Sequence, residues 1–404
     1  LKGQALGAML PQVNASTNWS ANNQKTSTPA SPNAPASISS SNYQGARYTV
    51  SLSQSLLDFA KFWDWRRAQE VENQYASENI EAQHVLMFNV VEKYFNVLEA
   101  EDQLYYFTAE EESTLKQLEQ VQKQFDKQLI LITDVYEVEA RLDQIKATKI
   151  EAETAIVIAT ESLKELTNIT PAGLYKLRDE IDYKPLEGKL DDWIEVAKSE
   201  NPLLAAQISA IAAASDNVAV QKSRYLPVVE MQLNYNSTNT GYQSINLGRN
   251  YDTQVAAINV NIPLFTGGTT TNRMFEAQHR LSISKYENDA KIRGLIKETS
   301  DSFLSSNASV KRISATRKAL ESTTKARESL ETGFSYGEQT IGDVLKARQA
   351  EYLSKRDLSK AKYSYIKNKM RFMKATGLIS QENMVEVNNW LQPVPIQQAS
   401  GSHN

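Results

Sequence analysis

Cysteine is absent from the 404 residues of this chain, and histidine occurs only three times. Without thiols the chain forms no disulfide framework, thiolate zinc site, iron–sulfur cluster or cysteine nucleophile. The three histidines, His84, His279 and His403, lack the spacing of a metal site, and the sequence contains no catalytic constellation. We therefore expect no enzyme activity, no cofactor and no bound metal.

A large excess of one charge and long hydrophobic runs are also missing. With 44 basic and 48 acidic residues the formal net charge is −4, which excludes a strongly basic nucleic-acid binder. A membrane-spanning helix needs about 20 mostly apolar residues, and the apolar runs at 85–91 and 129–132 are far shorter. This count favours a soluble chain, but the alternating strands of a transmembrane β-barrel escape such averages.

The two ends carry separate expectations. The sequence begins at Leu1 with no initiator methionine and no leader pattern, so we expect any signal peptide to precede Leu1. At the other end, residues 392–404 are rich in Pro, Gln and Ser and are expected to be disordered.

An internal duplication organises the chain. Ala68-Gln69 recurs as Ala277-Gln278, at an offset of 277 − 68 = 209. Phe125 and Phe334, Ile132 and Ile341, Asp134-Val135 and Asp343-Val344, and Thr167 and Thr376 share that offset. A constant offset over this length indicates two equivalent long elements of matched length.

Each copy begins with a pattern of two strands. Val229, Met231, Leu233 and Tyr235 alternate with polar residues, which is the period of a strand with one apolar face. The return segment 256–264 repeats the alternation, and copy one shows it in residues 13–19 and 48–52. Segments 20–42 and 236–250, rich in Ser and Asn, are predicted to be the connecting loops.

Long helices follow the strands in both copies. Residues 60–127 contain no Pro or Gly and show apolar residues at intervals of three and four, which predicts a helix of about 100 Å. Residues 271–332 show the same pattern in copy two, apart from the single Gly294. A shorter helix should follow each, at about 134–166 and 343–375.

The segments between the copies are more irregular. The shorter helices should end near Asn168 and Gly377, which suit a left-handed cap. Residues 170–190 contain two Pro and two Gly and are predicted to be irregular, whereas Asn201 and Pro202 should open another helix. By symmetry, copy one should begin inside the equivalent helix at Leu1.

Four strands per chain cannot close a membrane barrel, because small barrels need about eight. Open edges in a bilayer leave unpaired backbone groups, each costing several kcal/mol. Three chains would supply twelve strands, and one symmetry operation would also close the helices into a cylinder. We therefore predict a mixed α and β fold with internal duplication: a trimeric twelve-stranded transmembrane β-barrel continuous with a long α-helical barrel.

Five ordered sequence phrases carry a family resemblance. They are LSQSLLD at 52–58, YFNVL at 94–98, ITDV at 132–135, TIGDVL at 340–345 and YSYI at 363–366. With the duplication, they make the chain resemble the TolC family of outer-membrane efflux and type I secretion proteins from Leu10 to about Leu391. The resemblance implies a homotrimer in the outer membrane, a periplasmic helical tunnel with an equatorial domain, and a tapered tip.

The resemblance also implies function. The chain would be a passive exit duct for small molecules or proteins, gated at the tip and opened when a periplasmic adaptor and an inner-membrane transporter of the RND, ABC or MFS class dock. The alternative is a periplasmic coiled-coil adaptor or scaffold, which would not need lipid-facing strands.

The expected domains are a truncated first helix and first strand pair at 1–59, a first long helical hairpin at 60–167, an equatorial segment at 168–200, a helix at 201–225, a second strand pair at 226–266, a second long hairpin at 267–376, and an equatorial segment with the C-terminal tail at 377–404.

The gate implied by the resemblance lies at two helix-to-helix turns, 124–135 and 334–344. Thr133 and Asp134 match the gating pair of the family, and Asp343 matches its first aspartate ring. Three residues depart from the pattern of the best-known members: Phe334 replaces a Tyr, Gln339 an Arg, and Lys346 the second aspartate ring. A weaker latch and weaker cation block are therefore expected.

Each candidate also has a purely structural interpretation. Asp134 and Asp343 open their helices and would cap free amides there. The acidic run 110–112 is interpreted as a solvated face. The candidate docking residues for an adaptor could instead pack the turns; they are Leu129, Ile130, Leu131, Ile132, Thr340 and Ile341.

Overall fold

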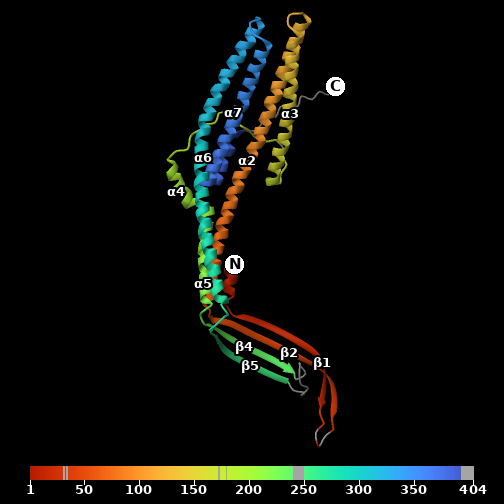
Figure 1. Cartoon of the computed structure of the whole chain (residues 1–404), viewed down its shortest axis with the longest axis vertical. Helices are drawn as coiled ribbons and strands as arrows, with labels where there is room; N and C mark the ends of the chain where they lie inside the picture. The colour runs from red at the N-terminus through yellow and green to blue at the C-terminus, as the bar shows by residue number, and fades with distance from the viewer. Residues whose placement is uncertain (31, 33–34, 172, 179, 240–249, 393–404) are drawn as a thin grey trace. The chain divides into compact units, whose positions relative to one another are not determined.

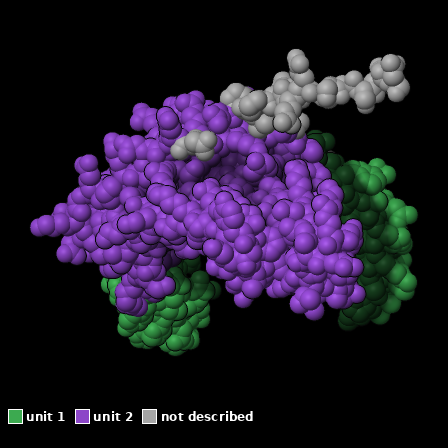
Figure 2. Space-filling view, turned by 90° about the horizontal axis from the view of Figure 1, so that it is seen from above, with its two compact units in different colours: residues 1–77, 205–289 green, residues 78–204, 290–404 purple. Residues whose placement is uncertain are grey.

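The computed structural model describes residues 1–30, 32, 35–171, 173–178, 180–239 and 250–392. The chain divides into two compact units, each built from both sequence copies (Figure 2). Unit 1 comprises residues 1–77 and 205–289, and unit 2 comprises residues 78–204 and 290–404.

Unit 1 contains an antiparallel sheet in the order β1-β2-β4-β5 (Figure 1). The pairing register places Leu52 opposite Leu233, and Leu233 opposite Ala256. Residues paired in this way point to the same face, so the apolar positions of the alternating pattern share one face, as predicted. The strands are β1 (Gln12–Thr28), β2 (Ser37–Leu57), β4 (Val228–Asn239) and β5 (Asn250–Asn261).

The strands are longer than their apolar alternation suggested. Most of the predicted loop 20–42 belongs to the β1–β2 ladder, which continues to the Thr28–Ser37 pair. The loop prediction was wrong because ladder hydrogen bonds use the backbone, which Ser and Asn supply as well as apolar residues. In copy two, residues 236–239 also belong to β4, and 240–249 lie outside the described residues. Strand β5 ends at Asn261, two residues before Pro263, which has no amide to donate.

Two shorter helices, α1 (Lys2–Gly7) and α5 (Pro202–Ser223), precede the strand pairs. Asn201 caps α5 as predicted, because its Oδ1 accepts the Leu203 amide at 2.9 Å. In the described residues, α5 is also long and apolar enough to cross a membrane, which the search for apolar runs missed. One such helix is weak evidence of a span, and α5 buries Asp216 beside Arg66 at 3.8 Å, as a core helix does.

Unit 2 holds most of four long helices, which run alongside one another in the order α6, α7, α2, α3 (Figure 1). The bounds are α2 (Phe59–Asp126), α3 (Ile132–Thr167), α6 (Thr269–Ser335) and α7 (Ile341–Ala375). All four helix predictions are confirmed within three residues. Asn168 and Gly377 adopt the expected left-handed conformation, with φ of 54° and 76°.

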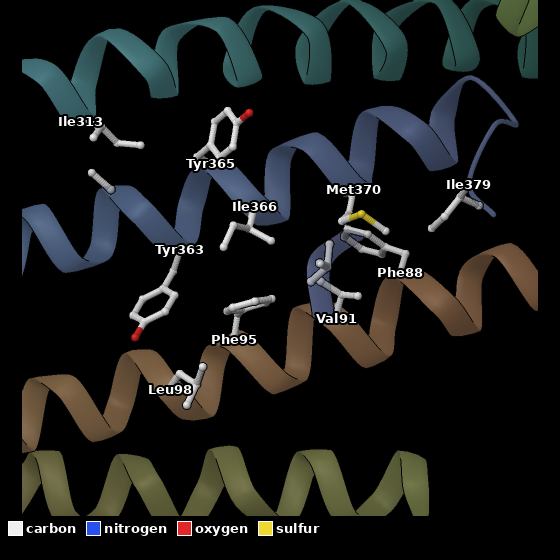
Figure 3. Close-up of a cluster of buried hydrophobic side chains, with 12 residues drawn as sticks. Phe88, Val91, Phe95, Leu98, Ile313, Tyr363, Tyr365, Ile366, Met370 and Ile379 are labelled. Atoms are coloured by element: carbon white, nitrogen blue, oxygen red, sulfur yellow. The ribbon is translucent and has the colours of Figure 1, made fainter. Parts of the chain in front are cut away.

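A buried cluster joins α2 to α7 in unit 2 (Figure 3). Phe95 and Leu98 of α2 face Tyr363 and Ile366 of α7, and each is at most 3% exposed. The Tyr363 hydroxyl donates to Asp102 at 2.8 Å, and burial together with this carboxylate raises the Tyr363 pKa above its usual range. Long-range packing therefore holds the two sequence copies together.

The irregular segments cover this cluster. The short strands β3 (Lys176–Leu177) and β6 (Leu391–Gln392) pair, and Leu177 and Leu391 pack against the cluster. Helices α4 (Leu190–Glu200) and α8 (Gln381–Asn389) complete the segments. Gln392 therefore belongs to a strand and not to a disordered tail, and residues 393–404 lie outside the described residues.

Candidate gate and docking tip

Two tight turns connect the long helices of unit 2. In the first, Gln128 takes a left-handed φ of 62° and the Leu129 amide donates to Gln124 O at 3.0 Å. In the second, Gly337 has a φ of 77° and the Glu338 amide donates to Gly333 O, also at 3.0 Å. Both turns thus reverse the chain direction in the same way. Each uses a residue in the left-handed conformation, and Gln128 and Gly337 are equivalent positions of the two sequence copies.

One apolar cluster, here called the tip cluster, packs the two turns together. It draws on all four long helices, so the ends of both hairpins are held at one level. Val138 and Val121 are 0% exposed, and Ile341 is 2% exposed. The cluster consists of Val121, Val135, Val138, Ile341, Val344 and Leu345, with Leu118, Phe125, Ile130 and Phe334 packed against it.

The two predicted gate aspartates cap their own helices, as the structural interpretation proposed. Asp134 Oδ2 accepts the Leu131 amide at 3.2 Å. Asp343 forms the fuller arrangement: its Oδ2 accepts the Thr340 hydroxyl at 2.7 Å, and its amide donates to Thr340 Oγ1 at 3.2 Å. Leu131 offers no side-chain acceptor at the equivalent position. The first turn is therefore capped by one side chain and the second by two.

Capping also explains the electrostatics of Asp343. Hydrogen bonds from the Thr340 hydroxyl and amide, with a smaller attraction to Lys346, lower the Asp343 pKa. Lys346 is exposed and Thr133 is exposed. Lys346 is thus the smallest contributor to the lowered Asp343 pKa, and its effect on a ring of aspartates stays a prediction.

Replacing Thr340 by Ala is expected to destabilise the start of α7 by about 1 kcal/mol, because the amide of Asp343 loses its acceptor. Hydrogen exchange of residues 341–344 should quicken. Leu131→Ala is the matched control, because it removes no cap hydrogen bond.

The contribution of Asp343 should also depend on pH. Because the folded pKa is lowered, the stabilisation is complete above about pH 4 and is lost as the pH falls through the folded pKa. Equal hydrogen exchange of residues 341–344 in wild type and Thr340→Ala near neutral pH would contradict the capping role of Thr340.

The expected docking residues divide into exposed and buried sets. Leu129 and Leu131 are 69% and 71% exposed, and Ile132 is 39% exposed. Ile341 is buried, and Ile130 is partly buried where it packs against the tip cluster. The Ile341 side chain fills the tip cluster between the hairpins, so an adaptor cannot reach it in this arrangement, and the docking assignment of the other residues stays a prediction.

The two predicted latch positions in the second turn also differ in environment. Phe334 packs its ring against the tip cluster. Gln339 is exposed, and its side chain lies close to Gly333. A Cβ added to Gly333 would be only 2.8 Å from Gln339 Cγ. Gln339 therefore folds over the end of α6, and Phe334 holds the turn by apolar packing.

A buried ion cluster around Glu110, farther along the helices from the turns, was not predicted from the sequence. Glu110, placed in a solvated acidic run, is 2% exposed; it binds Arg141 of α3 at 2.5 Å and Arg356 of α7 at 2.8 Å. Successive helical residues point about 100° apart, so only one member of the run faces inward. Residues 110, 114, 117 and 121 lie on one helical face and all are buried, but three of the four are polar, so the sequence carries no apolar pattern that marks this face as inward.

Further polar contacts attach α7 to its neighbours. Arg348 donates from Nε to Glu331 of α6 at 2.6 Å and from Nη1 to the Ser113 carbonyl of α2 at 3.0 Å. Glu351 lies 2.5 Å from Arg327 of α6. Burial opposes ionisation of Glu351, but Lys355 and Arg327 outweigh it and keep the Glu351 pKa below its usual range. Polar contacts thus join helix α7 to both α6 and α2.

No cluster of three or more His, Asp or Glu side chains able to hold a metal occurs in the part of the chain that the structure describes. The tip instead has charged side chains at the second turn, Asp343 and Lys346, and exposed apolar side chains at the first turn, Leu129 and Leu131. The buried tip cluster packs against both turns. These properties suit contact and conformational change.

Comparison with known proteins agrees with this architecture. A family model described as outer membrane efflux protein matches residues 3–168 and again 193–378. Outer membrane protein TolC of Vibrio cholerae is 30% identical over 95% of this chain and 86% of its own length. The alkaline protease secretion protein AprF of Pseudomonas aeruginosa is 27% identical over 83% of this chain and 70% of its own.

The fold is also that of a solved channel. The Campylobacter jejuni CmeC outer membrane channel superposes with a TM-score of 0.79 at 15% identity, covering 96% of this chain and 83% of that one. The repeated family match spans most of the chain and follows the internal duplication. The chain therefore belongs to the outer membrane efflux protein family and is a non-enzymatic, TolC-like channel of the bacterial outer membrane with a periplasmic helical extension.

Proposed function

We propose that three copies of this chain form a passive exit duct gated at the tip. A periplasmic adaptor docks at the tip, and an inner-membrane transporter of the RND, ABC or MFS class supplies the energy. The duct would carry small molecules, as in efflux, or proteins, as in type I secretion. AprF is itself named for alkaline protease secretion, which supports including proteins.

The sheet supports the trimer. Strands β1 and β5 are its outer members, so each leaves one edge unpaired within the chain. The apolar face is open, with Val50 45% exposed and Ile258 68% exposed. Lipid would cover that face, and neighbouring copies would pair the edges. A periplasmic adaptor has no need of such a sheet, so the duct is the better proposal.

The tip supports the gate, and its geometry is the observation that carries the proposal. Both turns lie against the tip cluster, so one movement of α7 would move both. Leu129 and Leu131 are exposed at the end of the first hairpin, where they cost free energy unless a partner covers them. The first turn is also the less fully capped of the two.

Conductance in planar bilayers tests the duct and its gate together. We expect a detergent-solubilised trimer to form ion-conducting pores. Changing Phe334→Tyr with Gln339→Arg should lower the single-channel conductance, because Arg adds a charge-assisted bond toward Asp134, worth roughly 1.5 to 3 kcal/mol. A monomeric protein or the absence of pores would overturn the duct, and unchanged conductance would overturn only the gate.

Replacing Leu129 and Leu131 together by Ser is expected to abolish adaptor docking without unfolding the chain. Burying each leucine in an interface is worth about 1.5 to 3 kcal/mol, so affinity should fall by at least about a hundredfold. Binding of the co-expressed adaptor to the purified channel measures this. Leu115→Ser is the control, because Leu115 is 46% exposed but lies within α2, away from the turn. Equal loss of binding in the control would contradict the assignment.

A further inference from the structure

A cavity lined by four arginines lies in unit 1, near the ends of three helices. Its volume is about 300 Å³. Arg67 comes from α2, Arg224 directly follows α5, and Arg273 and Arg280 come from α6. All of the lining residues belong to one chain and to one compact unit. We call this the arginine cavity.

Helical spacing explains how the α6 side chains meet at the cavity. Arg273 and Arg280 are seven residues apart, and Ala277 lies between them. Residues at these intervals share one face of a helix. Ala277 is 2% exposed and has a short side chain, so it leaves room between the two guanidinium groups.

The charges of the arginine cavity are only partly compensated. Glu276 is the one carboxylate that lines it, and Glu276 pairs with Arg280 at 2.7 Å. Arg224 and Arg273 are exposed, and neither forms an ion pair with any residue that the structure describes. Two guanidinium groups at one cavity therefore lack a carboxylate partner.

Two other lining side chains have polar atoms without a partner. Arg67 pairs with Asp64 at 2.6 Å, but its Nε is buried and donates no hydrogen bond within the described ranges. Gln221 Oε1 is likewise buried and accepts none. Buried polar groups in proteins are nearly always hydrogen-bonded. A ligand with both an acceptor oxygen and a hydroxyl donor would satisfy these two side chains once they turn toward it.

The position of the cavity indicates the source of such a ligand. Arg273 lies 273 − 269 = 4 residues, or about 6 Å, from the start of α6. Between β5 and α6, Leu264 and Phe265 are 91% and 88% exposed. In the proposed duct the sheet lies in the bilayer, so these apolar side chains reach the edge of the hydrocarbon region. Arg273 then follows within the headgroup layer, which is about 5 to 8 Å thick.

We propose that the arginine cavity binds a phosphate group with a neighbouring hydroxyl, the chemistry of a glycerol phosphate headgroup. Guanidinium groups bind phosphate oxygens through paired N–H donors, and Arg224 and Arg273 provide them without a competing carboxylate. Gln221 accepts the hydroxyl. The cavity has the volume of a small ligand site. An anionic phospholipid of the periplasmic leaflet and a soluble glycerol phosphate share this chemistry, and the membrane source rests on the proposed function.

Native mass spectrometry of the detergent-solubilised full chain tests the site with two probes, phosphatidylglycerol and glycerol phosphate. The double variant Arg224→Gln with Arg273→Gln should bind at least about tenfold more weakly. Arg293→Gln with Arg317→Gln is the matched control, because both are exposed arginines of α6 that do not line the cavity. Circular dichroism should show unchanged thermal unfolding in the cavity variant, because Arg224 and Arg273 form no ion pair to lose.

The two probes distinguish the sources. Binding of phosphatidylglycerol alone assigns the site to a lipid, and binding of glycerol phosphate, alone or with displacement of the lipid, assigns it to a soluble ligand as well. Equal affinity in the cavity and control variants would overturn the site. A wild type that forms no pores in planar bilayers overturns the proposed duct, whereas a pore-forming wild type that binds neither probe overturns only the arginine cavity.

Discussion

Replacing Glu110 by Ala is expected to lower the free energy of unfolding by about 3 to 5 kcal/mol, because two arginines lose the carboxylate that compensates their burial. Arg141 and Arg356 are only 16% and 11% exposed in their side chains, so water cannot replace Glu110 fully. The two arginines belong to α3 and α7, so the loss would loosen α2 from both neighbours at once.

Chemical unfolding of the detergent-solubilised protein, followed by circular dichroism, measures this loss. Glu112→Ala is the matched control, because Glu112 is 67% exposed and water screens its pair with Lys116. A triple variant with Met at 110, 141 and 356 should recover much of the stability, since buried ions often tolerate apolar replacement as a set. Similar unfolding curves for Glu110→Ala and Glu112→Ala would refute the role of the buried ion cluster.

Changing Gly377 to Ala should be nearly as damaging, for a steric reason. Gly377 has a φ of 76°, and an added Cβ would lie 2.5 Å from the Glu200 carbonyl oxygen and 2.9 Å from Asn201 Cα. Backbone atoms cannot rotate away, so the end of α7 or the start of α5 would have to move. Left-handed strain costs about 1 to 2 kcal/mol, and overpacking adds about 1 to 3 kcal/mol.

Gly337 provides a control with almost the same backbone. Its φ is 77°, but an added Cβ would meet nothing within 4 Å. Gly337→Ala should therefore cost only the strain, about 1 to 2 kcal/mol. Comparing the two variants in thermal unfolding separates strain from collision, and equal losses would show that the close approach to Glu200 and Asn201 is unimportant.

The long helices could be predicted because their signal is local and repeated. Absence of Pro and Gly, spacing of three and four, and cap residues such as Asn201 and Asn168 each act within a few positions. The alternation of Met231 and Leu233 likewise predicted a one-sided sheet. The strand ends could not be predicted, because between Ser20 and Asn42 the ladder depends on a partner backbone and gives no pattern of apolar side chains.

The tip shows the same division at the level of single residues. The sequence identified both turns and the capping aspartates, since a carboxylate at the first turn of a helix acts on its own amides. It could not separate Ile341 from Leu129, because both are apolar residues at turns. One is buried by the opposing hairpin and the other is not, and that difference depends on how the two copies pack.

The sequence by itself determined the duplication, the one-sided strands, the lengths of the helices and, through its ordered phrases, the family, because these depend on residues close together in the chain or on a fixed offset. The tertiary structure alone decided that Glu110 is an internal ion rather than part of a wet surface, since its partner Arg356 is 246 residues away. It also decided which apolar residues remain exposed at the tip. Burial is a property of neighbours, and those neighbours come together only when the two copies fold against each other.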